Sequence, residues 1–339
     1  MKVTQLAFLL VALLLLNGCE RENDPYVARV GAVSFPGTPW HRTWTYVDET
    51  LKKNNSVVSL DMYLSGELGT EEYVYSQIRR GRTQIGGFSL QGSAAVVPEI
   101  SLLLSPYLFD SYEEVDFITD NYVAPFFDEL FAEKGLVVLS WSEVGWTSYY
   151  ATEPFSTPAD LAGRKLRSSK ALSSQIMIDS IDGNAVPLPF PDIIPSLQTG
   201  LIDGGESSSI FYALVGTPKE APYLTLTKHA FDTGLVIGNK SWFESLTAEA
   251  QQSLLDAIMP LPEIRAMVRS YEQDVLNNPE KFGIQSLHEL SDAELALWKE
   301  ATKNNHKVMI KRIGGRAQEL YNLIQQGKLV FAAQQKKPI

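Results

Sequence analysis

Cations and hydroxyl groups gather at the end of one predicted strand, in segment 163–170. Arg167 ends the strand predicted for 165–167, and Lys170 follows after two serines. A guanidinium group can donate two parallel charge-assisted hydrogen bonds to a carboxylate, so the segment is a candidate binding site for an organic acid. The alternative interpretation is a solvated strand end, because exposed cations are common and contribute little.

Two further segments combine aromatic residues with turn residues. Segment 141–150 contains Trp146, Thr147 and Tyr149, and segment 187–191 holds Phe190 within a rigid, proline-rich loop. Each segment also has a purely structural interpretation. The first is consistent with core packing at a junction of two lobes, and proline-rich loops are more often structural than functional.

The chain offers little support for other kinds of site. It contains neither the Gly-x-Ser-x-Gly pattern nor a P-loop, so enzyme chemistry is unsupported. Its four histidines lack the spacing of metal ligands, and no metal or other cofactor is expected. The formal net charge of -11, without any basic block, argues against nucleic acid as a partner.

The N-terminal residues predict export. Lys2 precedes an apolar run over 6–16, which is too short to span a bilayer but typical of a signal-peptide core. The run leads into Leu16-Asn17-Gly18-Cys19, which is similar to a bacterial lipobox. We therefore expect a signal peptide at 1–18, lipidation of Cys19 and a lipid-anchored tether at 19–26. Cys19 is the only cysteine, and the alternative is a simple cleaved signal with an incidental cysteine.

Predicted strands and helices alternate along most of the chain. Strands are expected at 27–33, 57–64 and 84–88, with helices beginning after Thr38 and Thr70, which indicates a parallel α/β lobe. At 339 residues the chain is longer than one hydrophobic core usually grows, so two lobes are expected.

The C-terminal part is predicted to be almost wholly helical. A capping box at 291–294 predicts a helix running to about Ile313. Pro260 and Pro262 predict a kink or break in a long helix, and residues 331–339 are expected to be a loosely ordered tail.

Several segments, taken in order, resemble the solute-binding proteins of tripartite ATP-independent periplasmic (TRAP) transporters, of the DctP type. The resemblance covers roughly 27–257. Each segment alone is weak evidence for the family, but all of the segments in this order are specific to it. The segments are Ser65-Gly66-Glu67-Leu68-Gly69, Val97-Pro98-Glu99, Pro106-Tyr107-Leu108-Phe109, 160–167, Pro187-Leu188-Pro189-Phe190, 197–204, and 223–228 with His229.

The resemblance implies a two-lobed α/β fold of the Venus-flytrap type, with crossing strands, a long connecting helix and a helical C-terminus. It implies that residues 27–145 and about 234–275 form lobe I, and that 146–233 and about 276–330 form lobe II. The implied function is capture of a small carboxylate and its delivery to one small and one large membrane subunit. The implied localisation is the periplasm, on a membrane.

The resemblance also implies roles for single residues. Arg167 falls on the carboxylate-binding arginine, and Phe190 falls on the aromatic residue that packs over the ligand. Thr147 stands where many members carry a second arginine, and Ser207 where an asparagine holds the ligand. Leu90 stands where sialic-acid binders carry an acidic residue.

These departures predict a less polar cavity. We expect the lining to include Trp146, Tyr149, Leu90, Phe190 and Phe211. The expected ligand is a monocarboxylate with an apolar body. Lys170 either supplies a second cation or is solvated.

Other functions remain open at this point. A lipid anchor is uncommon in the family, which suggests cooperation with a partner lipoprotein. The same lobes would serve a sensory protein that reports its ligand to a membrane receptor. An exported enzyme would need a nucleophile and a base in the cleft, and an inert surface lipoprotein would bind no ligand.

Overall fold

The computed structural model describes residues 26–335, so the predicted signal peptide and Cys19 lie outside the described residues. In the described chain, nine strands form one sheet in the order β2-β1-β3-β8-β4-β7-β5-β6, with β9 paired to β8. The strands are β1 Val27–Ala32, β2 Ser59–Tyr63, β3 Ile85–Ser89, β4 Leu136–Ala151, β5 Lys165–Ser168, β6 Asn184–Pro187, β7 Gly204–Ser208, β8 Tyr223–Asn239 and β9 Ser286–Glu289.

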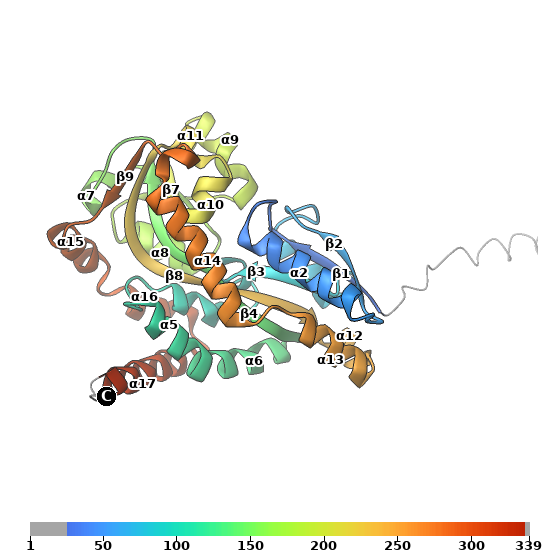
Figure 1. Cartoon of the computed structure of the whole chain (residues 1–339). Helices are drawn as coiled ribbons and strands as arrows, with labels where there is room; N and C mark the ends of the chain where they lie inside the picture. The colour runs from blue at the N-terminus through green and yellow to red at the C-terminus, as the bar shows by residue number, and fades with distance from the viewer. Residues whose placement is uncertain (1–25, 336–339) are drawn as a thin grey trace, which may run out of the picture.

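The long antiparallel strands β4 and β8 run through both halves of the molecule (Figure 1). The C-terminal part of β8 pairs with β3, which continues into the parallel strands β1 and β2. The C-terminal part of β4 pairs with β7, which continues into the parallel strands β5 and β6. Each long strand therefore belongs to both lobes, and the predicted two-lobed α/β fold with crossing strands is confirmed.

Helices of the first lobe begin where the sequence predicts them. Helix α2 starts after Thr38, whose side chain accepts a hydrogen bond from the His41 amide, and α3 starts after Thr70 in the same way. The helices around this lobe are α2 Pro39–Lys53, α3 Glu71–Arg79, α4 Leu90–Ser93, η1 Pro98–Leu104, α5 Tyr112–Ile118, η2 Thr119–Val123, α6 Ala124–Glu133, α12 Lys240–Ser245 and α13 Ala248–Ala257.

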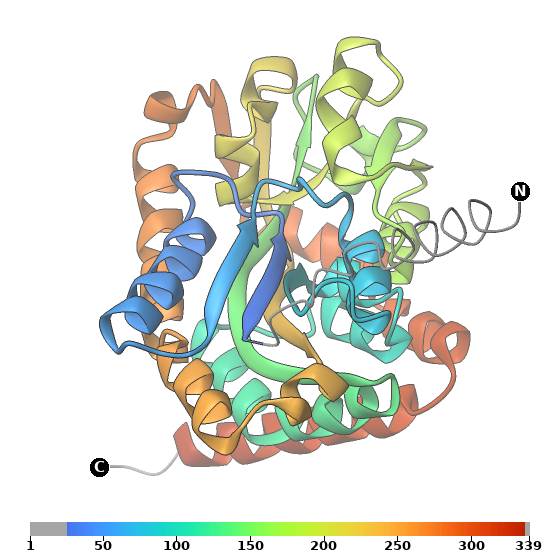
Figure 2. The same ribbon diagram turned by 90° about the vertical axis from the view of Figure 1, so that its right-hand side faces the viewer.

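The second lobe carries shorter helices, which occupy the upper part of Figure 2. Its core combines residues of β4 and β8 with apolar side chains of these helices, such as Ile193, Leu197 and Tyr212. The helices are α7 Pro158–Leu161, α8 Leu172–Asp179, η3 Phe190–Asp192, α9 Ile193–Gln198, α10 Ser209–Leu214, α11 Thr217–Glu220 and η4 Pro279–Phe282.

One long helix, α14 Leu261–Asn277, lies along the crossing strands and contacts both lobes (Figure 1). It packs against β4, against α2 of the first lobe and against α10 of the second. The break predicted from Pro260 and Pro262 is present, because α13 ends at Ala257 and α14 begins at Leu261.

The C-terminal helices differ from the prediction. The helix predicted to run to Ile313 is divided into α15 Asp292–Thr302 and α16 Asn305–Ile313. Helix α17 Ala317–Gln335 then packs on α5 and η2, in the part of the chain assigned to lobe I, whereas the sequence assigned 276–330 to lobe II. The prediction of a loosely ordered tail is wrong for 331–335, which remain helical, and Phe331 packs against Phe117 with a centroid distance of 5.6 Å.

Within residues 26–335, no helix is both long enough and apolar enough to cross a membrane. The same residues contain no group of three or more histidine, cysteine, aspartate or glutamate side chains placed to hold a metal ion.

Candidate binding site between the lobes

A cavity of about 730 Å³ lies between the two lobes. Phe35 of the β1–α2 connection and Trp40 of α2 form part of its wall. Residues of η3 and α10, including Phe190 and Phe211, face them from the other lobe. This volume and a largely apolar wall with a few charged groups are typical of sites for small metabolites.

Four aromatic side chains connect the lobes beside the cavity. The ring of Phe35 lies 6.5 Å from that of Phe190, which lies 5.3 Å from Phe211. Phe211 is stacked on Trp40 at 4.3 Å, and the indole nitrogen of Trp40 donates a hydrogen bond to the Glu143 carbonyl. Contacts of this kind favour a closed arrangement, because each aromatic pair is stabilising beyond the area that it buries.

Arg167 reaches the cavity from β5 in the second lobe. Its side chain is only 6% exposed, and its Nε donates to the carbonyl of Leu188 at 3.1 Å. No described acidic side chain forms an ion pair with it. Burial lowers the pKa of the guanidinium, although nearby acidic groups such as Glu206 oppose that shift. A buried cation without an ion-pair partner favours an anionic ligand.

Four carboxyl groups also line the cavity, those of Glu71, Glu72, Glu206 and Asp232, and Glu206 is the one paired with a histidine. Its Oε2 lies 3.1 Å from Nε2 of His229, in a buried pair. Burial alone would raise the pKa of Glu206, but the hydrogen bond and charge of His229 lower it below its usual value. Glu206 therefore supports the wall behind Arg167 as an ionised group.

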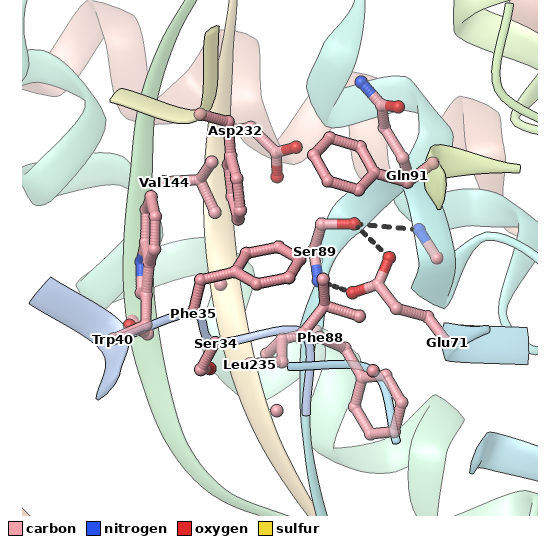
Figure 3. A pocket seen from close by; sticks show the side chains of 18 of the residues that line it. Ser34, Phe35, Trp40, Glu71, Phe88, Ser89, Gln91, Val144, Asp232 and Leu235 are labelled. Carbon is pink, nitrogen blue, oxygen red and sulfur yellow. Dashed lines mark hydrogen bonds between the residues drawn. The ribbon is translucent and has the colours of Figure 1, made fainter. Parts of the chain in front are cut away.

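Glu71 and Asp232 lie in the wall without a basic partner (Figure 3). Glu71 accepts hydrogen bonds from the amide and hydroxyl of Ser89 at 2.6 and 2.8 Å. Asp232 accepts one from the Leu90 amide at 3.0 Å. Burial raises the pKa of Glu71 to about 7 and that of Asp232 well above its usual value.

A family of proteins that bind solutes also matches this chain by sequence. The model of the bacterial extracellular solute-binding proteins, family 7 (DctP), matches residues 30–312. The chain belongs to this family. The resemblance to TRAP solute-binding proteins indicated by the ordered segments is thereby confirmed.

Characterised relatives and solved structures support the assignment. A solute-binding protein of Chromohalobacter salexigens is 31% identical over 215 residues, which cover 63% of this chain and 64% of that protein. The ectoine-binding periplasmic protein TeaA of Halomonas elongata is 25% identical over 79% of this chain and 80% of its own length. A Chromohalobacter salexigens TRAP solute-binding protein, solved with D-glucuronate, has a TM-score of 0.81 at 26% identity, covering 88% of this chain and 99% of that one.

Six of the nine ligand-binding residues predicted from the sequence line the cavity of this family member. They come from five elements (β4, β5, η3, β7 and α10) and the loop after β5, which the fold brings to one place. These residues are Thr147, Arg167, Lys170, Phe190, Ser207 and Phe211. Lys170 is exposed at the rim, in contrast to the buried Arg167.

Trp146, Tyr149 and Leu90 lie outside the lining, contrary to the prediction. Trp146 packs against Phe231 with a centroid distance of 5.0 Å. Tyr149 is fully buried against His229. Leu90 belongs to the apolar core of the first lobe, although its amide supports Asp232.

Irregularities in β4 explain the two aromatic errors. Ser142 and Val144 line the cavity, and regular alternation along the strand would place Trp146 there next. A register shift between Glu143 and Gly145 instead brings Thr147 to the cavity. A second shift, between Thr147 and Tyr149, turns Tyr149 away from it.

The sequence analysis missed Glu71, Asp232 and the cavity-lining residues of the β1–α2 connection. One signal was available for Asp232, because it is the only charged residue in the mostly apolar segment 230–237. Glu71 looked like an ordinary first-turn acid that stabilises the start of a helix.

Proposed function

We propose that this protein is the solute-binding component of a TRAP transporter, which captures a small organic carboxylate between its lobes and delivers it to the membrane subunits. Family membership supports the transport role. The observation that carries the ligand class is the buried guanidinium of Arg167, which faces the cavity and has no described acidic partner.

The printed names of relatives support the same class. A Rhodobacter capsulatus relative, 24% identical over 86% of this chain, is a C4-dicarboxylate-binding protein. An Escherichia coli relative, 25% identical over 70%, is a 2,3-diketo-L-gulonate-binding protein. The cavity of this chain combines Arg167 with an apolar aromatic wall, which supports a carboxylate with an apolar body, such as a monocarboxylate.

Substitution of Arg167 by alanine tests this function. The variant should lose at least about tenfold in affinity for any carboxylate bound by the wild-type protein, because one or two charge-assisted hydrogen bonds disappear. Calorimetry with the carboxylate released from purified, denatured protein would measure the loss. Arg42→Ala is the matched control, since Arg42 is exposed on α2 away from the cavity. Equal affinities of the two variants would contradict the proposed role.

Attachment to a membrane through Cys19 is a separate part of the proposal. It is supported by the apolar run and the Leu-x-Gly-Cys pattern, since one acylated cysteine tethers a soluble domain to a membrane surface. Cys19→Ser should move the protein from the membrane fraction to the soluble periplasmic fraction. A variant that remains in the membrane fraction would show that the anchor is misidentified.

A further inference from the structure

The charged groups of the cavity are divided between its two sides. The cations Arg167 and Lys170 belong to the second lobe, on and just after β5. The acids Glu71 and Glu72 belong to the first turn of α3 in the first lobe, and Asp232 to the crossing strand β8. None of these five side chains forms an ion pair with another described residue.

Asp232 is the most buried of these three acids. Its side chain is 4% exposed, and its Oδ1 accepts the amide of Leu90 at 3.0 Å. No side chain among the described residues donates a hydrogen bond to Oδ2, although the residue borders the cavity. Burying a carboxylate without a partner costs free energy. A ligand that donates a hydrogen bond to Oδ2 of Asp232 would remove that cost.

Glu71 adds a second acceptor of the same kind. Its Oε1 accepts the Ser89 amide and its Oε2 the Ser89 hydroxyl (Figure 3). Burial raises the pKa of this carboxyl group, and the hydrogen bonds donated to both of its oxygens oppose that shift by favouring the ionised form. A positively charged group of a ligand would be attracted to the Glu71 carboxylate, whereas a negatively charged group would be repelled from it.

We propose that the solute is a zwitterion, in which a carboxylate binds Arg167 and a protonated nitrogen binds Asp232 and Glu71. The inference rests on the proposed function, because the carboxylate end occupies the same site. An ammonium group has three donors and no acceptor, so it can donate hydrogen bonds to two carboxylates at once. Such a ligand would also connect the lobes, since its two charged ends bind on opposite sides of the cavity.

Matched pairs of ligands test the charge at the second end. Ligand-free protein is titrated with two matched pairs, butanoate with 4-aminobutanoate and 3-phenylpropanoate with phenylalanine, and with the zwitterion ectoine and the anion D-glucuronate as unmatched additions. The melting temperature is read first and calorimetry follows for each compound that raises it. The strongest ligand should carry both a carboxylate and a protonated nitrogen.

Variants then locate the nitrogen. Asp232→Asn should weaken the strongest ligand about tenfold or more and leave its deaminated counterpart within about threefold, because the amide oxygen can still accept the Leu90 amide. Glu71→Gln should act in the same direction. Glu49→Gln removes the same charge from an exposed position on α2 and should change neither affinity.

The outcomes separate the two proposals. A strongest ligand without a basic nitrogen, such as D-glucuronate, would overturn the zwitterion and leave carboxylate transport intact. The zwitterion is overturned in the same way if Asp232→Asn changes the affinity for the strongest ligand no more than Glu49→Gln does. If no carboxylate raises the melting temperature, both the zwitterion and the proposed function fail.

Discussion

Glu71 is a carboxyl group whose protonation changes near neutral pH. Its pKa is raised from the ordinary 4.5 to about 7, mainly by burial and also by the adjacent Glu72 on α3. Hydrogen bonds from Ser89 and the positive charge of Arg167 on β5 act in the opposite direction. Asp232 on β8 also lies close enough for Glu71 to raise its pKa. The acidic side of the cavity thus contains more protons than its residue types suggest.

This shift makes the ligand-free protein less stable as the pH rises. The folded-state pKa exceeds the unfolded value, so the native state binds more protons between pH 4.5 and about 7, and stability falls across that range. Glu71→Gln removes this titration. From about pH 5 to about pH 8, wild type should lose about 1–3 kcal/mol relative to the variant, since the side chain is only half-buried.

Urea unfolding of ligand-free protein at both pH values measures that difference. Glu49→Gln, at an exposed position, should track the wild-type protein at both values. A constant difference between wild type and Glu71→Gln would mean that Glu71 stays ionised throughout.

At single-residue level, the sequence predicted the site as far as local chemistry allows. Arg167 and Phe190 were found because their types and neighbouring motifs carry the information. Trp146 was wrongly predicted to line the cavity because a β-bulge changes which side chains of β4 face it. The local sign of this bulge is Gly145, whose φ is 106°. Asp232 was missed because its place in the cavity wall, without a basic neighbour, is visible only in the folded chain.

At the level of elements, charged side chains attach α14 to the crossing strand β4 and to α5 and η2 of the first lobe. Arg269 donates to both oxygens of Glu143 on β4 and of Asp116 on α5, at distances from 2.6 to 2.9 Å. Arg265 forms a bidentate ion pair with Asp120, donating one hydrogen bond to each carboxylate oxygen. Burial raises the pKa of Glu143 and the bonds from Arg269 lower it, so the carboxylate depends on this arginine to stay charged.

Arg269→Ala should therefore destabilise the protein by about 3 kcal/mol, because it leaves Glu143, 1% exposed, as an unpaired buried acid. Arg316→Ala is a close control. Arg316 also contacts two carboxylates and an aromatic ring, but its partners Glu129 and Glu319 are exposed. The free energy of unfolding of Arg316→Ala should be at most about 1 kcal/mol below that of the wild-type protein. Equal midpoints of chemical unfolding for the two variants would contradict the argument.

Element boundaries followed the sequence where a cap or a proline determined them. Thr38, Thr70 and Ser291 each accept a hydrogen bond at the start of a predicted helix. The end of the chain was misjudged because the order of 331–335 comes from tertiary contact, including the packing of Phe331 on Phe117. Composition alone contains no sign of that contact.

At the level of the whole molecule, β4 and β8 join the lobes, and the fold allows relative movement around them. The alternation of strands and helices predicted the lobes, and the ordered family segments predicted that strands would cross between them. The contacts that hold the cleft in its present form were not predictable, because Phe35 and Phe190 are distant in sequence and meet only across the cavity.

Phe35→Ala tests whether that contact favours closure. Loss of one aromatic pair, at about 0.5–1.5 kcal/mol, should shift the population toward an open form and weaken ligand binding about two- to tenfold. Small-angle X-ray scattering of the ligand-free variant should give a larger radius of gyration than wild type. Phe331→Ala removes a comparable ring pair far from the cavity and should alter neither quantity. If both variants keep the wild-type radius and affinity, closure does not depend on the Phe35–Phe190 contact, and the other connections between the lobes, such as the Trp40–Phe211 stack, the crossing strands and α14, set the angle between them.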